Sequence, residues 1–297
     1  QVHIKKGVFT FSLPFDREMN NVLGMRSGYT CCLENMHQGW TKFTTHLWYG
    51  TDDGGLAALH YAPSEVSAKL GKSKTSVTVN EATNYPFENN IQFEFKMQAA
   101  VSFPFRLRIP AWCKLANIYL NGEKLRPEKG GQVITVSRTW KNGDQLKLEL
   151  PMQVSVSQWG SNSRAIERGP LVYALKLKEI WEKGTDEQQG DYFTVHTPDP
   201  WNYGLVADHL KQVQNIQVKK VQPVQNHFVW DLQHAPIEIK VKARKIPGWT
   251  IANDIALIPV TARDGLYMGK VENETEIITL VPYGFTKVRI VAFPVVK

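Results

Sequence analysis

Alternating apolar and polar positions dominate the chain and predict β-strands. The alternation is clearest at 55–61, 91–97 and 105–109, where a period of two is typical of strands with one buried face. Further strands are expected at 75–79, 132–137, 153–158, 171–177, 237–243, 277–281 and 287–293. This spacing is that of antiparallel β-sandwiches. We therefore predict an all-β architecture from about residue 55 onward.

Two Asn-Gly pairs predict tight turns between strands. Asn121-Gly122 follows the apolar segment 116–120, and both residues of such a turn readily adopt positive φ. Asn142-Gly143, directly before 144–150, repeats the hairpin signal. The stretch 181–204 instead combines Gly, Pro, Asp and aromatic residues, which predicts a long loop packed over one sandwich.

The first fifty residues contain a different periodicity. Apolar residues recur at steps of three or four between 32 and 49, at Leu33, Met36, Trp40, Phe43, Leu47 and Trp48. This pattern predicts one amphipathic helix, which ends before the turn-forming run 51–55. A second boundary is expected near Pro151, so we divide the chain into 1–52, 53–152 and 153–297.

Composition excludes several classes of protein. With 42% hydrophobic and 21% charged residues in a chain of 297, disorder is excluded, and no apolar run reaches the ~18 residues of a membrane helix. Lys and Arg exceed Asp and Glu by 35 to 28, a net charge of +7, but the basic residues are dispersed, which argues against nucleic-acid binding. The three cysteines exclude a disulfide-stabilised small domain.

The start of the chain has no initiator Met, no apolar signal region and no small-residue cleavage site. We therefore expect a chain that has already been cut and lacks an N-terminal portion. The compartment stays open between the periplasm, which is slightly favoured, and the cytoplasm of a bacterium.

The adjacent Cys31 and Cys32 at the start of the predicted helix are the most unusual local feature. A vicinal disulfide is strained, so these residues suit thiolate metal ligands or a nucleophile with a neighbour. The helix dipole and a bound zinc ion would each lower their pKa. Two packed thiols, without a metal, are the alternative that the residue types leave open.

Other chemically capable residues give weaker signals. His37 and His46 are nine residues apart and lack the i, i+4 spacing of a shared metal site, so we interpret both as surface or hydrogen-bonded histidines. Candidates for a general acid or for solvated charge are Asp16, Glu18 and Glu34.

Cys113 and four tryptophans are interpreted mainly as packing residues. Cys113 is expected to be a buried small hydrophobe. Four tryptophans are candidates for sugar stacking or for core packing, which we favour: Trp112, Trp140, Trp201 and Trp249. The Asn273-Glu-Thr275 sequence matches an N-glycosylation acceptor, but so short a pattern occurs by chance.

Seven motifs in order resemble the β-L-arabinofuranosidases of glycoside hydrolase families 127 and 146. The first is Gly-Tyr-Thr-Cys-Cys-Leu-Glu-Asn-Met-His-Gln-Gly-Trp at 28–40, and the others lie at 55–64, 107–112, 121–123, 165–173, 200–203 and 280–284. The resemblance implies two antiparallel β-sandwich domains preceded by the last helical segment of an (α/α)₆ barrel. Most of that barrel is then absent from this chain, and 1–52 is its remnant.

The same resemblance implies a site and a mechanism. Cys31 corresponds to the nucleophile of a retaining glycoside hydrolase, and Cys31 and Cys32 both correspond to ligands of Zn²⁺. The remaining zinc ligands and the acid/base residue are expected upstream of this chain. Plant-type arabinose-containing glycans are the implied substrates, and the isolated chain is expected to be inactive.

A second hypothesis is a non-catalytic β-sandwich module that binds carbohydrate or supports oligomerisation, with structural cysteines. The apolar face of the helix predicts aggregation or association if no neighbour covers it. A homo-oligomer formed through the sandwich domains is a further expectation.

Overall fold

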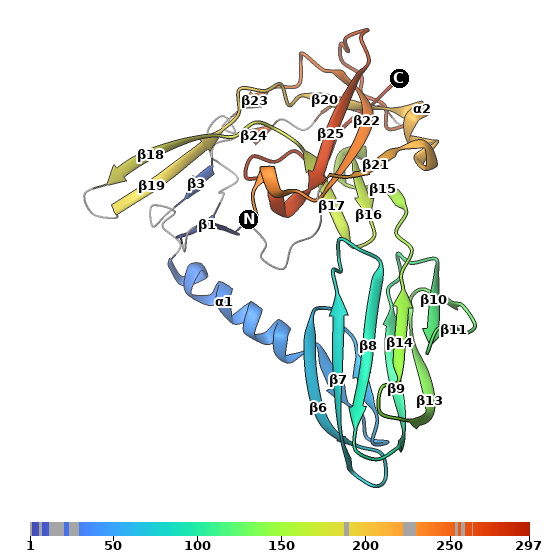
Figure 1. The fold of residues 1–297 in the computed structure, drawn as a ribbon. Helices are drawn as coiled ribbons and strands as arrows, with labels where there is room; N and C mark the ends of the chain where they lie inside the picture. Colours follow the sequence, from blue (N-terminus) through green and yellow to red (C-terminus); the bar gives the residue numbers. More distant parts are fainter. Residues whose placement is uncertain are drawn as a thin grey trace. The chain divides into compact units, whose positions relative to one another are not determined.

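A computed structural model describes residues 2–5, 8–11, 21–23, 30–186, 190–221, 230–252, 255–256, 259–262 and 264–297. Side chains are described from residue 38 onward, apart from 161, 186–190, 192, 222–229, 251–255, 257–258 and 263. The described chain is mainly β, as predicted (Figure 1). It divides into two compact units, one formed by 37–152 and the other by 1–36 together with 153–297.

The unit formed by 37–152 contains two β-sheets. The seven-stranded sheet has the order β11-β10-β14-β8-β7-β6, with β12 also paired to β10. Its strands are β6 (Ser64–Leu70), β7 (Thr75–Thr83), β8 (Asn90–Met97), β10 (Leu115–Leu120), β11 (Glu123–Lys124), β12 (Glu128–Lys129) and β14 (Gln145–Glu149). The second sheet has the order β13-β9-β5-β4 and comprises β4 (Trp48–Gly50), β5 (Leu56–Ala58), β9 (Val101–Ile109) and β13 (Gln132–Trp140).

Alternation along these strands builds one hydrophobic core between the two sheets. In β8, Ile91, Phe93 and Phe95 are buried whereas the intervening residues are more exposed. Both sheets contribute apolar side chains to the same buried cluster, so the unit is a β-sandwich. Its pairing is antiparallel except between β5 and β9, which run parallel.

Trp140 lies at the centre of this core. It is fully buried, its ring stacks 4.0 Å from that of Phe95, and its indole N–H donates to the Phe103 carbonyl at 3.1 Å. The core role that we favoured for Trp140 is therefore confirmed, and Trp249 is likewise buried. Trp112 is half-buried and packs against the sandwich core.

The two Asn-Gly pairs have different outcomes. Asn121 and Gly122 have φ of 49° and 86° and join β10 to β11, as predicted. The hairpin predicted at Asn142-Gly143 is wrong, because β13 and β14 on either side belong to different sheets. Hydrogen bonds from this loop to the end of β8 explain the crossing: Gly143 N–H donates to the Phe95 carbonyl, and Asn142 Oδ1 accepts from Met97 N–H.

The predicted helix is present but ends earlier than expected. Helix α1 covers Thr30–Thr45, and Trp48 and Tyr49 belong instead to β4, which pairs with β5. Leu47 is 5% exposed, and the Trp48 indole N–H donates to Ser64 Oγ. Burial in the sandwich therefore overrides the helical period at these positions.

The second unit is built around an eight-stranded sheet of order β15-β16-β17-β25-β22-β20-β26, with β21 paired to β22. Its strands are β15 (Val154–Gln158), β16 (Arg164–Arg168), β17 (Leu171–Leu175), β20 (Tyr203–Val206), β21 (Gln217–Lys220), β22 (Ile237–Lys245), β25 (Glu276–Pro282) and β26 (Val295–Val296). The β20–β26 pair is parallel. The short helix α2 (Ala207–Leu210) follows β20.

Smaller sheets complete the second unit. They contain β1 (Val2–Lys5) with β2 (Val8–Phe11), β3 (Asn21–Leu23) with β18 (Ile180–Asp186) and β19 (Gly190–His196), and β23 (Ile251–Ala252) with β24 (Ile255–Ala256). Strands thus occur well before residue 55, where the sequence predicts the β architecture to begin. For β3 the reason is non-local, since it pairs with β19, far along the chain.

Two further expectations in this unit are wrong. The predicted long loop at 181–204 contains the hairpin β18–β19 and the strand β20. The predicted strand at 287–293 forms only an isolated bridge between Phe293 and Arg164. Pro294 lacks the N–H that would continue a ladder at that point. Neither helix in the described part of the chain is long and apolar enough to cross a membrane.

Candidate active-site segment

Cys31 and Cys32 occupy the first turn of α1, the position predicted from the sequence. The first N–H groups of a helix have no partner within it, and the helix dipole places partial positive charge there. Both effects favour thiolate over thiol and so increase the nucleophilicity of a cysteine at neutral pH. The side chains of both cysteines lie outside the described residues.

The described half of α1 leaves apolar side chains uncovered. Every side chain from 38 to 46 is exposed, and Trp40 and Phe43 are 59% and 41% exposed. The Phe43 ring nevertheless lies 5.8 Å from that of His60, whose pKa is lowered by burial and by the nearby Arg108 charge. The helix therefore meets the sandwich at its C-terminal end, beside the loop that follows β5.

A buried carboxyl group lies in the same sandwich. Glu81 is 1% exposed, and its Oε1 accepts from Ala62 N–H at 3.1 Å. Ser64 Oγ lies 3.5 Å from Oε2 and itself accepts from the Trp48 indole N–H. Burial raises the pKa of Glu81 to about 8, so this carboxyl is mostly protonated at pH 7.

A carboxyl with so high a pKa matches the requirement for a general acid, but its position does not. Glu81 follows Val77 and Val79 on the inward face of β7, and it lines neither the hollow over β7, β8, β10 and β14 nor the one beside α2. Beside it, Tyr61 donates to the Arg108 carbonyl at 2.6 Å, and burial raises the Tyr61 pKa. We therefore interpret Glu81 as a structural group of the core.

Glu81 is not among the candidates that the sequence patterns indicated, although the sequence does contain a signal for it. It occupies an inward position in the alternating run 75–83, where an acidic residue is unexpected. A charged residue at a core position of a strand is the pattern that would have identified it.

Of the remaining acidic, histidine and cysteine candidates from the sequence, His46 and Cys113 have described side chains. The side chains of Asp16, Glu18, Glu34 and His37 lie outside the described residues. His46 is exposed just after α1, with Nδ1 2.5 Å from the Lys42 carbonyl. Cys113 is fully buried, as expected, and burial raises the pKa of its thiol.

The described side chains do not form a complete metal site. Among them, no group of three or more His, Cys, Asp and Glu residues is close enough to hold an ion. Catalytic zinc sites use three protein ligands, and structural ones use four. Cys31 and Cys32 have the right donor chemistry for zinc but supply two ligands at most.

Comparison with known families identifies the sandwich. Residues 55–152 match the family model described as the GH127 middle domain of β-L-arabinofuranosidases. This sandwich is similar to a GH127 middle domain. The resemblance to family 127 drawn from the sequence motifs is thereby confirmed, and the double cysteine lies on the helix that directly precedes this domain.

Three solved structures share the fold over most of the chain. A GH127 β-L-arabinofuranosidase from Geobacillus stearothermophilus T6, Ara127N, is 22% identical, with a TM-score of 0.59, and the match covers 90% of this chain and 36% of that one. A protein described as a glycoside hydrolase is 21% identical, with a TM-score of 0.63 and coverage of 97% and 42%. The GH127 β-arabinofuranosidase BT3674 is 17% identical, with a TM-score of 0.59 and coverage of 89% and 38%.

These structures are considerably longer than the present chain. The chain spans about two-fifths of their length or less. A search of curated proteins found no match.

Proposed function

We propose that this chain is the C-terminal part of a retaining glycoside hydrolase that acts on β-L-arabinofuranosides, with Cys31 as the nucleophile. One observation carries the proposal. The vicinal cysteines occupy the first turn of α1, and that helix leads through β4 directly into the GH127 middle domain.

The proposed reaction has two displacements. The Cys31 thiolate attacks the anomeric carbon while the glycosidic C–O bond breaks and an acid/base carboxyl protonates the leaving oxygen. Water then attacks the same carbon, the C–S bond breaks, and the carboxylate takes the proton from water. Two inversions at one carbon give net retention. We place the acid/base carboxyl outside this chain.

The proposal includes a zinc ion because cysteine thiolates are common zinc ligands. Cys31 and Cys32 would hold the ion together with ligands from outside this chain. When bound, Zn²⁺ would keep the thiolates deprotonated at neutral pH. Plant-type arabinose-containing glycans are the proposed substrates. Without the acid/base carboxyl, the isolated chain should lose roughly 10²- to 10⁴-fold in rate.

The test compares cysteine variants of the longest protein that the gene encodes. Cys31→Ser should reduce release of p-nitrophenol from p-nitrophenyl β-L-arabinofuranoside by at least about 10²-fold, since a hydroxyl replaces the thiolate. Cys113→Ala, which removes a cysteine buried in the sandwich, is the matched control and should stay active. The α-L-anomer should not be cleaved by either.

Two results would contradict the proposal. Cys31→Ser with unchanged turnover would exclude this residue as the nucleophile. Absence of activity in the unmodified protein, together with sugar binding that Cys31→Ser leaves intact, would favour the non-catalytic carbohydrate-binding module. Zinc content, measured by mass spectrometry, should fall in Cys32→Ser and not in Cys113→Ala.

A further inference from the structure

The outward face of the seven-stranded sheet contains a hollow that the proposed hydrolysis does not use. It has a volume of about 450 Å³ and lies over β7, β8, β14 and β10. That volume falls within the range of small-molecule and oligosaccharide pockets. The strands place outward-pointing residues in rows across the sheet, because side chains alternate between its two faces.

Two rows form the floor of the hollow. Asn80 lies opposite Glu94, which lies opposite Gln145. In the next row, Ala82 lies opposite Gln92, Gln92 opposite Lys147, and Lys147 opposite Tyr119. Four strands at their usual separation span about 14 Å, which suits an extended chain of sugar units better than a single compact ligand.

The hollow exists because two of its positions lack bulk. Ala82 is the small residue at one end of its row, and Gly122 in the turn after β10 has no side chain. A Cβ at Gly122 would meet nothing within 4 Å. The turn therefore leaves one side of the hollow open.

The amides that line the hollow are available to a ligand. Asn80, Gln92 and Gln145 have no side-chain hydrogen bond to any described residue. Each amide offers two donor hydrogens and an acceptor oxygen. Sugar hydroxyls also donate and accept, so three such amides on adjacent strands match a polyhydroxylated ligand.

The charges around the hollow are largely paired. Glu94 lies 3.2 Å from Lys96, and Lys147 lies 2.5 Å from Glu149. The groups left for a ligand are therefore mainly the neutral amides, which favours a neutral ligand over an anionic one. The Tyr119 ring closes the end of the row, and Lys147 Nζ lies over this ring, 5.1 Å from its centroid.

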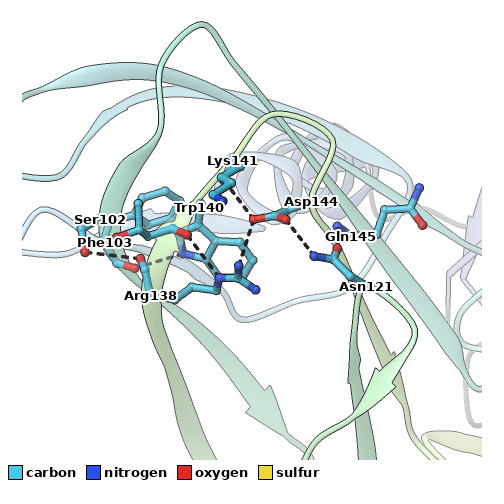
Figure 2. A network of polar contacts seen from close by, with 9 residues as sticks. Ser102, Phe103, Asn121, Arg138, Trp140, Lys141, Asp144 and Gln145 are labelled. Atoms are coloured by element: carbon cyan, nitrogen blue, oxygen red, sulfur yellow. Dashed lines mark hydrogen bonds and ion pairs between the residues drawn. The ribbon is translucent and has the colours of Figure 1, made fainter.

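A polar network around the buried Asp144 carboxylate fixes the turn beside the hollow (Figure 2). Asn121 donates its side-chain N–H to Asp144 at 2.8 Å and accepts from Gln145 N–H at 2.8 Å. Asp144 also accepts from Lys141 N–H and lies 3.6 Å from Arg138. Figure 2 shows the Gln145 amide extending away from this network. Its backbone is thus held in place while its side chain stays available.

We propose that this hollow, formed by Asn80, Gln92, Gln145, Tyr119 and Ala82, binds a neutral oligosaccharide. The site is distinct from the Cys31 segment and would hold a glycan chain without cleaving it. The inference rests on the proposed function only for the choice of arabinose-containing probes. The geometry of the hollow and the pairing of its charges support a neutral oligosaccharide without reference to that function.

The test measures binding by the full 297-residue chain. Isothermal titration with arabino-, xylo- and cello-oligosaccharides, and with oligogalacturonate as the anionic comparison, should give saturable binding of at least one neutral series and none of oligogalacturonate. Ala82→Phe fills the hollow and should abolish this binding. Ser76→Phe is the matched control, since Ser76 is exposed on the same strand and face but outside the hollow.

A second variant tests the amides without adding bulk. Gln92→Ala combined with Gln145→Ala should weaken binding at least about tenfold, because each removes hydrogen bonds to the ligand. Both positions are exposed, so unfolding by urea should be unchanged. No binding of any neutral series, binding of oligogalacturonate alone, or binding that survives Ala82→Phe would each overturn the proposal.

The two proposals fail separately. Cys31→Ser should leave the titration unchanged, and loss of hydrolysis in that variant says nothing about the hollow. Conversely, Ala82→Phe tests the hollow alone, whether or not Cys31 is a nucleophile.

Discussion

Replacing Glu81 by Gln should stabilise the protein at neutral pH and have little effect in acid. In the folded state the pKa of Glu81 is about 8, raised by burial from a reference value of 4.5. The protonated form is therefore favoured by folding. Stability from this group is fully present below pH 4.5, falls as pH rises between 4.5 and 8, and is lost above 8.

The magnitude follows from the same two values. Each pKa unit corresponds to about 1.4 kcal/mol, so the shift from 4.5 to about 8 amounts to about 5 kcal/mol over that pH range. At pH 7 the raised pKa of Glu81 lowers the free energy of unfolding of the unmodified protein by about 3 kcal/mol relative to acid pH. The glutamine carbonyl can still accept from Ala62 N–H, as Glu81 Oε1 does, and it carries no charge to desolvate.

The assay is urea unfolding of both proteins at pH 5, 7 and 8.5. The free energy of unfolding of Glu81→Gln should exceed that of the unmodified protein by an amount that grows with pH. Glu65→Gln, at an exposed position on the adjacent strand, controls for removal of a carboxylate from this sheet. A difference that stays constant from pH 5 to 8.5, or a variant less stable at pH 7, would refute the reasoning.

Three further outcomes test the sandwich. Trp140→Phe should lower the free energy of unfolding, measured in urea, by about 2 kcal/mol, since the Phe103 carbonyl loses its indole partner and the core loses volume. A loss of stability smaller than that caused by the same substitution at an exposed tryptophan would contradict this. Gly122→Ala should lower the free energy of unfolding by about 1 kcal/mol, because φ is 86° at this position. Gly39→Ala should instead stabilise helix α1 by about the same amount, because a Cβ at Gly39 would meet no neighbouring atom. In a variant with both other cysteines replaced by Ser, Cys113 should react with a thiol reagent only after unfolding, because it is fully buried.

Local patterns were sufficient for features that depend on near neighbours in sequence. The alternation at 91–97 predicted β8, Asn121-Gly122 predicted its turn, and the helical period predicted α1. In each case the information lies within a few residues, since strand period, positive φ and helical period are local properties.

The candidate functional sites were also only partly predictable from the sequence. The position of Cys31 and Cys32 at a helix start was readable from the sequence. The hollow on the seven-stranded sheet was not, because its amides come from β7, β8 and β14 and become neighbours only through strand pairing.

By itself, then, the sequence determined the mainly β class, the helix that carries the cysteines, and the motifs of family 127. Only the tertiary structure decided that Trp48 leaves the helical pattern for a strand, that the segment at Asn142 crosses between sheets, and that 180–196 forms a hairpin paired with β3. The physical reason is common to all three. Burial against a distant strand is worth more than the local preference of the segment, and that partner cannot be identified from nearby residues.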